Sequence, residues 1–177
     1  EGALTDAFGS TDNRLLRGDI GWCSNFVEVD LGFGLWQDGG ALVFGDGTES
    51  GDKAMLLAVP LAADATLRLD IWKEQPVVPY GRAGLDSWLW NESWQCEYDT
   101  GGGDSVTAGT FGWHWAGGLA ILLDGIDLSA SSRLETVAGV NDTYLVAEYR
   151  QSYALGDKDE ILDFTSTDLT VGLKFDY

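Results

Sequence analysis

The last nine residues, LTVGLKFDY at positions 169–177, decide the fold that this sequence predicts. Apolar side chains occupy every odd position, namely Leu169, Val171, Leu173, Phe175 and Tyr177. Polar or small residues occupy the even positions, namely Thr170, Gly172, Lys174 and Asp176. Nine residues with a period of two have the length of a tilted transmembrane β-strand, with one face for lipid and one for a lumen. An edge strand of a soluble sheet is the alternative, so the rest of the chain has to decide.

The end of the chain also resembles the signal by which outer-membrane barrels are handed to their insertion machinery. That signal consists of a polar residue, a glycine two positions later, a hydrophobic residue three positions further on, and a terminal aromatic. Thr170, Gly172, Phe175 and Tyr177 fill these positions here. The resemblance implies a location in the outer membrane of a cell.

Composition points the same way. The 177 residues fit a single domain, 1–177, and they include 24 Gly and 8 Trp against 3 Pro and 2 Cys. Such glycine and aromatic usage is typical of a barrel with interfacial aromatic girdles. No run of 18 apolar residues occurs, so the sequence predicts no transmembrane helix.

The net charge of −19 argues against a nucleic-acid partner and against direct attraction to anionic headgroups. Acidic surface loops can coexist with lipopolysaccharide through loosely bound Ca²⁺ or Mg²⁺. No defined metal or cofactor motif is present, and we expect no cofactor.

Alternating segments predict an all-β, antiparallel, up-and-down transmembrane barrel. Seven strands are expected, at 14–22, 26–36, 54–71, 77–90, 111–124, 142–153 and 165–177. Pro60 predicts a bulge or bend, and residues 127–139 predict a short periplasmic helix capped by Ser129 or Ser131. Single-chain bacterial barrels usually have an even number of strands, so about eight are expected. The first strand is then missing upstream, supplied by another chain, or formed irregularly by residues 3–8.

Charged side chains on the other parity predict a salt-bridged lumen. The set comprises Arg17, Asp19, Glu28, Asp30, Arg68, Asp70, Arg82, Asp86, Glu148, Arg150, Lys174 and Asp176. An eight-stranded barrel is wide enough only for side chains to pack. The set therefore predicts a structural network that closes the lumen to ions, rather than a path for solutes.

Candidate chemistry is sparse. Glu28 and Asp30 could be drawn as paired glycosidase carboxylates, but neighbours on one strand face are more typical of a network. A lipid A deacylase would resemble a His-x-Ser pair, whereas this chain has His114, Trp115 and Ala116. His114 is the single histidine, and we expect it to be a packed lumen residue. No catalytic or metal site is predicted, and the chain is not expected to be an enzyme.

Several segments together resemble a known family. They are GDK (51–53), VVPYGRAGLDSWLW (77–90), GWHWAGGLAILLD (112–124), VNDTYLVAEYR (140–150) and LTVGLKFDY (169–177). Their pattern and order are similar to the outer-membrane β-barrel family of myxobacteria and related predatory bacteria, over residues 13–177. The resemblance implies a small barrel of about eight strands, with one strand before the position where this chain starts.

The function expected from these features is that of a non-enzymatic barrel that anchors or assembles cell-surface components. Its expected contacts are outer-membrane lipid, lipopolysaccharide, and other outer-membrane or surface proteins, through extracellular loops at 37–52, 91–110 and 154–165. A narrow solute channel, a lipid-modifying enzyme and a soluble lipocalin-like binding barrel are the alternatives.

Cys23 and Cys96 are not expected to form a disulfide with each other. With Tyr177 on the periplasmic side, counting strands backwards puts Cys23 in a periplasmic turn and Cys96 in an extracellular loop. The apolar band between them is about 25 Å tall, whereas a disulfide requires Cα atoms within about 7 Å.

Overall fold

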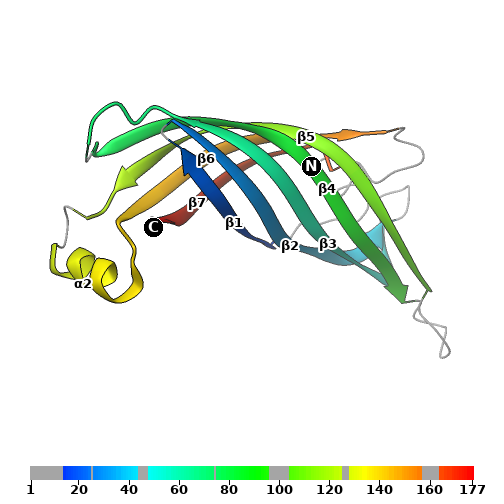
Figure 1. The fold of residues 1–177 in the computed structure, drawn as a ribbon. Helices are drawn as coiled ribbons and strands as arrows, with labels where there is room; N and C mark the ends of the chain where they lie inside the picture. The colour runs from blue at the N-terminus through cyan, green and yellow to red at the C-terminus, as the bar shows by residue number, and fades with distance from the viewer. Residues whose placement is uncertain are drawn as a thin grey trace.

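The computed structural model describes residues 14–24, 26–43, 48–73, 75–95, 104–124, 128–156 and 164–177. Seven strands form one antiparallel sheet in sequence order, and the sheet curls into a half-barrel (Figure 1). The strands are β1 (Arg14–Ser24), β2 (Val27–Val43), β3 (Glu49–Arg68), β4 (Val77–Gln95), β5 (Asp104–Leu122), β6 (Asp142–Leu155) and β7 (Ser166–Asp176). One helix, α2 (Leu128–Ala138), lies between β5 and β6. The predicted all-β, up-and-down topology is confirmed.

The connections divide between the two ends of the sheet. We call the end that carries α2 the helix end; the β1–β2, β3–β4 and β5–β6 connections lie there (Figure 1). The β2–β3, β4–β5 and β6–β7 connections lie at the opposite end, which we call the hairpin end. The described part of the chain contains no helix long and apolar enough to cross a membrane.

Strands β2, β3, β4 and β5 extend at least five residues further toward the hairpin end than predicted. The expected loops at 37–52 and 91–110 are largely ladder, since β2 runs to Val43 and β4 to Gln95. Asp38 pairs with Leu56, and Asn91 pairs with both Leu57 and Thr107. Backbone hydrogen bonds hold these polar segments together, and such bonds leave no trace in an apolar alternation.

The strand predicted at 54–71 ends earlier, at Arg68, because a side chain takes over the backbone pairing. The Gln75 amide donates to the Leu69 carbonyl (3.0 Å) and accepts from the Ile71 N–H (3.0 Å).

Of the bulge or bend predicted at Pro60, the bulge is not there. Phe33 pairs with Leu61 and Trp36 pairs with Ala58, so the β2–β3 register is the same on both sides of the proline. Gly34 makes this continuity feasible, because a Cβ at that position would lie 2.9 Å from the Pro60 ring. The register shift in this hairpin lies instead between Ala41 and Val43.

The predicted position of the helix is confirmed, but the predicted capping residues are wrong. Ser129 and Ser131 lie inside α2 rather than at its start, which is Leu128. The helix stops at Gly139, whose φ of 73° suits a residue without a side chain and whose N–H donates to the Glu135 carbonyl (3.1 Å).

Two neighbouring glycines on β5 differ in the space around them. Gly118 lies on the inward face of the sheet and Gly117 on the outward face. A Cβ on Gly118 would lie 2.5 Å from the Tyr80 ring and hydroxyl and 2.7 Å from the Ala147 carbonyl oxygen. A Cβ on its neighbour Gly117 would meet nothing within 4 Å. The inner face is therefore packed to the backbone, whereas the outer face is open.

Gly118→Ala should lower the free energy of unfolding by about 1–3 kcal/mol, because it overpacks the Tyr80 ring against rigid backbone. Gly117→Ala is the matched control and should change it by less than about 0.5 kcal/mol. Urea unfolding of the two variants and the wild type measures both. Equal effects of the two substitutions would contradict the assignment of the two faces.

Candidate functional site

Inward-facing polar side chains from all seven strands meet inside the curl of the sheet. Period-two alternation sends Asp30, Asp64, His114 and Arg150 to this face, each less than a tenth exposed. Apolar side chains on the opposite parity, such as Leu31 and Leu173, are half or more exposed. The polar groups form three connected clusters, ordered from the hairpin end toward the helix end.

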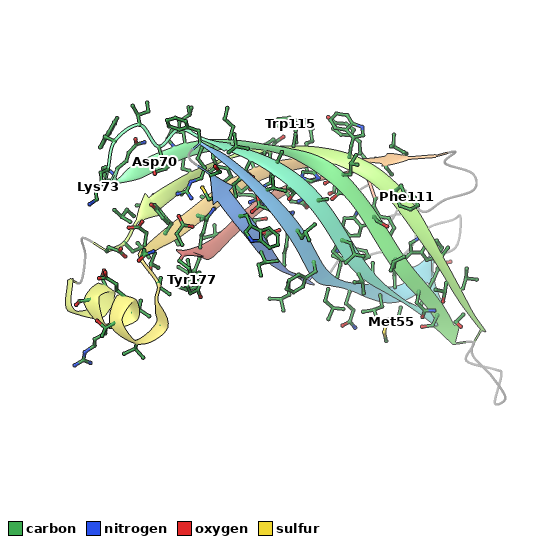
Figure 2. The ribbon with its side chains drawn as sticks, viewed as in Figure 1. Met55, Asp70, Lys73, Phe111, Trp115 and Tyr177 are labelled. Atoms are coloured by element: carbon green, nitrogen blue, oxygen red, sulfur yellow. The ribbon has the colours of Figure 1, made fainter. Side chains whose placement is uncertain are left out.

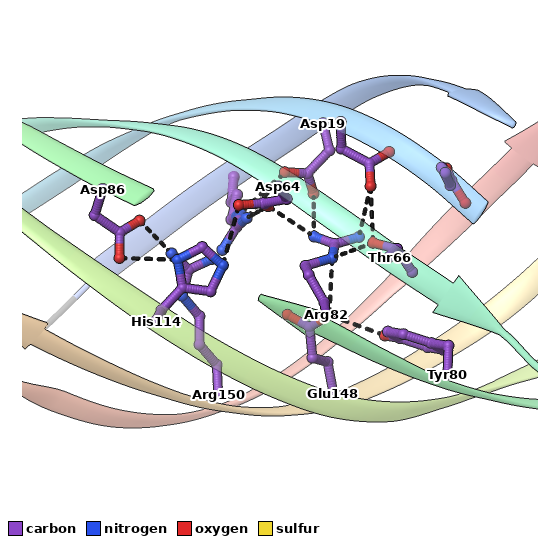
Figure 3. A network of polar contacts seen from close by, with 12 residues as sticks. Asp19, Asp64, Thr66, Tyr80, Arg82, Asp86, His114, Glu148 and Arg150 are labelled. Atoms are coloured by element: carbon purple, nitrogen blue, oxygen red, sulfur yellow. Dashed lines mark hydrogen bonds and ion pairs between the residues drawn. The ribbon is translucent and has the colours of Figure 1, made fainter. Parts of the chain in front are cut away.

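His114 is the centre of the first cluster (Figure 3). Its Nδ1 lies 3.0 Å from Asp86 Oδ2 and its Nε2 lies 3.0 Å from Asp64 Oδ1, with the imidazole and Asp64 side chains fully buried. Arg150 donates to the other Asp86 oxygen (2.5 Å). The Nδ1–Asp86 contact has the geometry of a hydrogen bond, whereas Nε2 and Asp64 Oδ1 are close but not aligned for one. His114 is therefore a packed lumen residue that bridges β3, β4 and β5.

Gly84 leaves the space for that bridge. A Cβ at position 84 would lie 2.2 Å from Asp64 Oδ1 and 2.8 Å from His114 Cε1. The glycine thus lets the carboxylate and the imidazole meet directly over the β4 backbone.

Arg82 is the centre of the second cluster (Figure 3). Its Nε donates to Thr66 Oγ1 (3.1 Å), and the guanidinium lies within 4 Å of four carboxylates. These carboxylates are Asp19 (3.5 Å), Asp30 (3.9 Å), Asp64 (3.5 Å) and Glu148 (3.7 Å). Arg17 adds a second cation, 3.1 Å from Asp64, so that cluster two is continuous with the His114 cluster.

The third cluster connects β2 and β3 with the edge strand β7 across the interior. Arg68 pairs with Asp176 of β7 (2.8 Å) and lies 3.8 Å from Glu28 of β2. Lys174 of β7 donates to both oxygens of Glu28. Charge pairs thus cross the interior from β2 and β3 to β7, which is not a sheet neighbour of either strand.

Apolar layers bound the charged clusters along the strands. At the hairpin end, Phe164 stacks on Trp88 with ring centroids 4.7 Å apart, and its edge meets Trp36 at 6.0 Å. Toward the helix end, Val78, Ala120 and Tyr144 form a second buried layer. The charged clusters therefore lie between one apolar layer toward the hairpin end and a second apolar layer toward the helix end.

Eleven of the twelve predicted network residues lie in these clusters. Asp70 does not: it follows the end of β3 and lies with Lys73 in the turn at the helix end (Figure 2). Asp64 and Thr66 of β3 and Tyr80 of β4 were missed, although the same even parity marks all three. Tyr80 donates to Glu148 (3.0 Å), and Thr66 donates to Asp30 (2.9 Å).

A cavity of about 1500 Å³ opens beside the clusters, between β1 and β7. Its lining includes Arg17, Asp30 and Arg82 on the inner wall and Phe164 toward the hairpin end. Each guanidinium on this wall already contacts carboxylates, so the wall presents paired charges rather than a concentrated charge of one sign.

Among the described residues, no group of three or more His, Cys, Asp or Glu side chains has the arrangement of a metal site. Loosely bound Ca²⁺ or Mg²⁺ at acidic surface loops stays a prediction, because residues 44–47, 96–103 and 157–163 of the expected loops lie outside the described residues. Cys96 is among them, which leaves the disulfide prediction untested. Cys23 is exposed near the helix end of β1, whereas Gln95, the residue before Cys96, ends β4 at the hairpin end.

No protein-family model matches the chain, and no curated protein matches it in sequence. The function therefore has to be argued from the geometry of the sheet and its interior.

Arg82→Met should lower the free energy of unfolding by about 3–5 kcal/mol, since it leaves buried carboxylates without their shared cation. Arg133→Met on the exposed surface of α2 removes the same charge without a buried partner and should cost less than about 0.5 kcal/mol. Adding Asp64→Asn to Arg82→Met should recover part of the loss. A cost for Arg82→Met as small as the control would show that the clusters do not stabilise the fold.

Proposed function

We propose that this chain is a non-enzymatic outer-membrane β-barrel protein that anchors or assembles components of the cell surface. One observation supports the membrane location. Apolar side chains lie on the outside of the curled sheet and charged side chains lie inside, which is the reverse of the arrangement in a soluble protein. Leu169, Val171 and Leu173 are 79%, 67% and 60% exposed, whereas His114 and Asp30 are 0% and 2% exposed. A continuous apolar outer surface of this kind is costly in water and favourable in hydrocarbon.

The apolar rows have the length that a bilayer requires. On β2 the outward row runs from Val27 to Leu35, and on β5 it runs from Phe111 to Ile121. A tilted strand crosses the hydrocarbon core in about 9–11 residues. Both rows therefore fit one bilayer, and the polar ends of the long hairpins extend beyond it.

Outer aromatic side chains gather on β5 and β6 toward the hairpin end. Trp113 stacks on Tyr153 with centroids 4.6 Å apart, and Trp115 lies 5.8 Å from Tyr149. Phe111 and Trp115 point away from the sheet (Figure 2). Such clusters are typical of the interfacial girdle of a membrane barrel.

The interior supports a structural rather than a catalytic or conducting role. The buried charges are engaged with one another, and the Phe164 layer covers them toward the hairpin end. We assign the hairpin end to the cell exterior, where longer connections are usual. Contacts with lipopolysaccharide and surface proteins then fall to this end, and the acidic chain favours divalent cations as bridges.

A narrow solute channel is the second candidate function. The cavity of about 1500 Å³ beside β1 and β7 favours it, because that part of the interior is unfilled. Ion conductance separates the two functions.

Leu173→Arg should prevent stable membrane insertion, because an outward arginine near the bilayer midplane costs about 2–4 kcal/mol. Thr170→Arg adds the same charge to the inward row of β7 and should insert normally. Protease protection and alkaline extraction of liposomes that contain each variant measure insertion. Normal insertion of Leu173→Arg, or soluble behaviour of the wild type without detergent, would contradict the membrane location.

The protein reconstituted in planar bilayers should give no steady open-channel current, since paired charges and the Phe164 layer occupy the lumen. A conductance that persists through repurification would instead support the channel.

A further inference from the structure

The sheet ends in two edges that face the same cavity. β1 has one sheet neighbour, β2, and β7 has one, β6; within the described residues no ladder joins β1 to β7. Six antiparallel steps separate the two strands, so β1 and β7 run in the same direction (Figure 1). They therefore cannot close the barrel as an antiparallel pair. One strand between them, antiparallel to both, would extend the existing pattern to eight strands.

Among the described residues, inward side chains at the centre of the sheet are buried, whereas those beside this gap are partly exposed. The side chains of Asp64 and His114 are fully buried, whereas those of Asp19, Lys174 and Asp176 are 29%, 25% and 27% exposed. A Cβ on inward-facing Gly172 would meet nothing within 4 Å. The cavity of about 1500 Å³ lies along both edges. The unfilled cavity therefore lies at the same place as the two strand edges that have no ladder partner among the described residues.

We propose that the gap between β1 and β7 is a docking site for one extended segment of a partner polypeptide, which completes the barrel by pairing with both edges. This inference rests on the proposed membrane barrel, because edge backbone groups in hydrocarbon cost several kcal/mol each when unpaired. β1 and β7 are 11 residues long, and the donated segment matches that length. Strand donation of this kind is an established mode of peptide recognition.

The two faces of the gap define the chemistry of the segment. Its outward residues continue the row of Leu16, Ile20, Leu169 and Val171 and are therefore apolar. Its inward residues enter a polar cavity beside paired charges and are small or polar. The inward carboxylates Asp19 and Asp176 of the edge strands are already paired, with Arg17 and with Arg68, so the inward residues of the segment do not need a charge.

A second copy of this chain does not fit the gap. Its β1 or β7 would have to run antiparallel to the edge that it joins, which turns the second copy upside down in the membrane. A separate segment can run antiparallel to both β1 and β7 without inverting a whole second barrel in the membrane.

Site-directed crosslinking tests the proposal on the full chain folded in detergent, in a Cys23→Ser, Cys96→Ser background. Ile20→Cys reports on the β1 edge, and Val171→Cys reports on the β7 edge. Leu85→Cys is the matched control, because it is as exposed but lies on β4, which is paired on both sides. The probe is a synthetic 11-residue peptide that alternates apolar and small polar residues, with a central outward cysteine. A shuffled peptide of the same composition is the second control.

We expect the alternating peptide to crosslink at Ile20→Cys and at Val171→Cys, with loss of both products for the shuffled peptide and no product at Leu85→Cys. Equal crosslinking at Leu85→Cys would overturn the proposal, since it would reflect adsorption to any apolar surface. A disulfide between Ile20→Cys and Val171→Cys of one chain, or between two chains, would overturn it as well. So would a link from Ile20→Cys to Ala7→Cys, which would show closure by the chain itself.

Liposome insertion of the same variants separates the two proposals. If the chain inserts but the peptide does not crosslink, only the docking site fails. If the chain does not insert, the membrane location itself fails.

Discussion

The alternation of side chains along a β-strand is the constraint on which this structure depends. Successive residues point to opposite faces, so each strand has to supply one row for the outside and one for the inside of the curl. In this chain the outside rows are mainly apolar, and each of the seven described strands contributes at least one ionisable side chain to the inside. A one-residue slip of any strand would bury its apolar row among charges and expose its charges. The same pattern therefore sets the register and sorts the chemistry of the two faces.

Because the inside of the sheet carries charged side chains, ion pairs connect the strands across the interior, as apolar contacts do in most soluble domains. Arg82 contacts four carboxylates from four different strands, and His114 links β3 to β4 through Asp64 and Asp86. Burying these ions is favourable only because nearly every one has a charged partner at short range. Small residues complete the arrangement, since Gly84 lets the Asp64 carboxylate reach the imidazole. A network of this kind is specific to one strand order, because each cation is shared among strands that only the curled sheet brings together.

The order of the strands also explains why β1 and β7 do not pair with each other in the part of the chain that the structure describes. Seven up-and-down strands place the first and the last in the same direction, and direct antiparallel closure is then ruled out by geometry. The third cluster links β7 to β2 and β3 through Lys174 and Asp176 across the interior, which holds the curl without a ladder at the gap. The edge strands thus keep a defined separation. An interior that is stabilised by charge pairs can leave one side accessible to a further strand.

The sequence alone determined what local periodicity encodes. The alternation of LTVGLKFDY and of the six earlier segments predicted seven strands, their faces and eleven of the twelve lumen charges that were named. Periodicity could not locate the ends of the long hairpins, because residues such as Asp38 and Asn91 are held there by backbone pairing that carries no apolar signature. It also could not show that Asp64 and His114 meet over Gly84, or that Asp70 leaves the ladder. Those contacts join residues far apart in the chain, so only the register and curl of the folded sheet decided them.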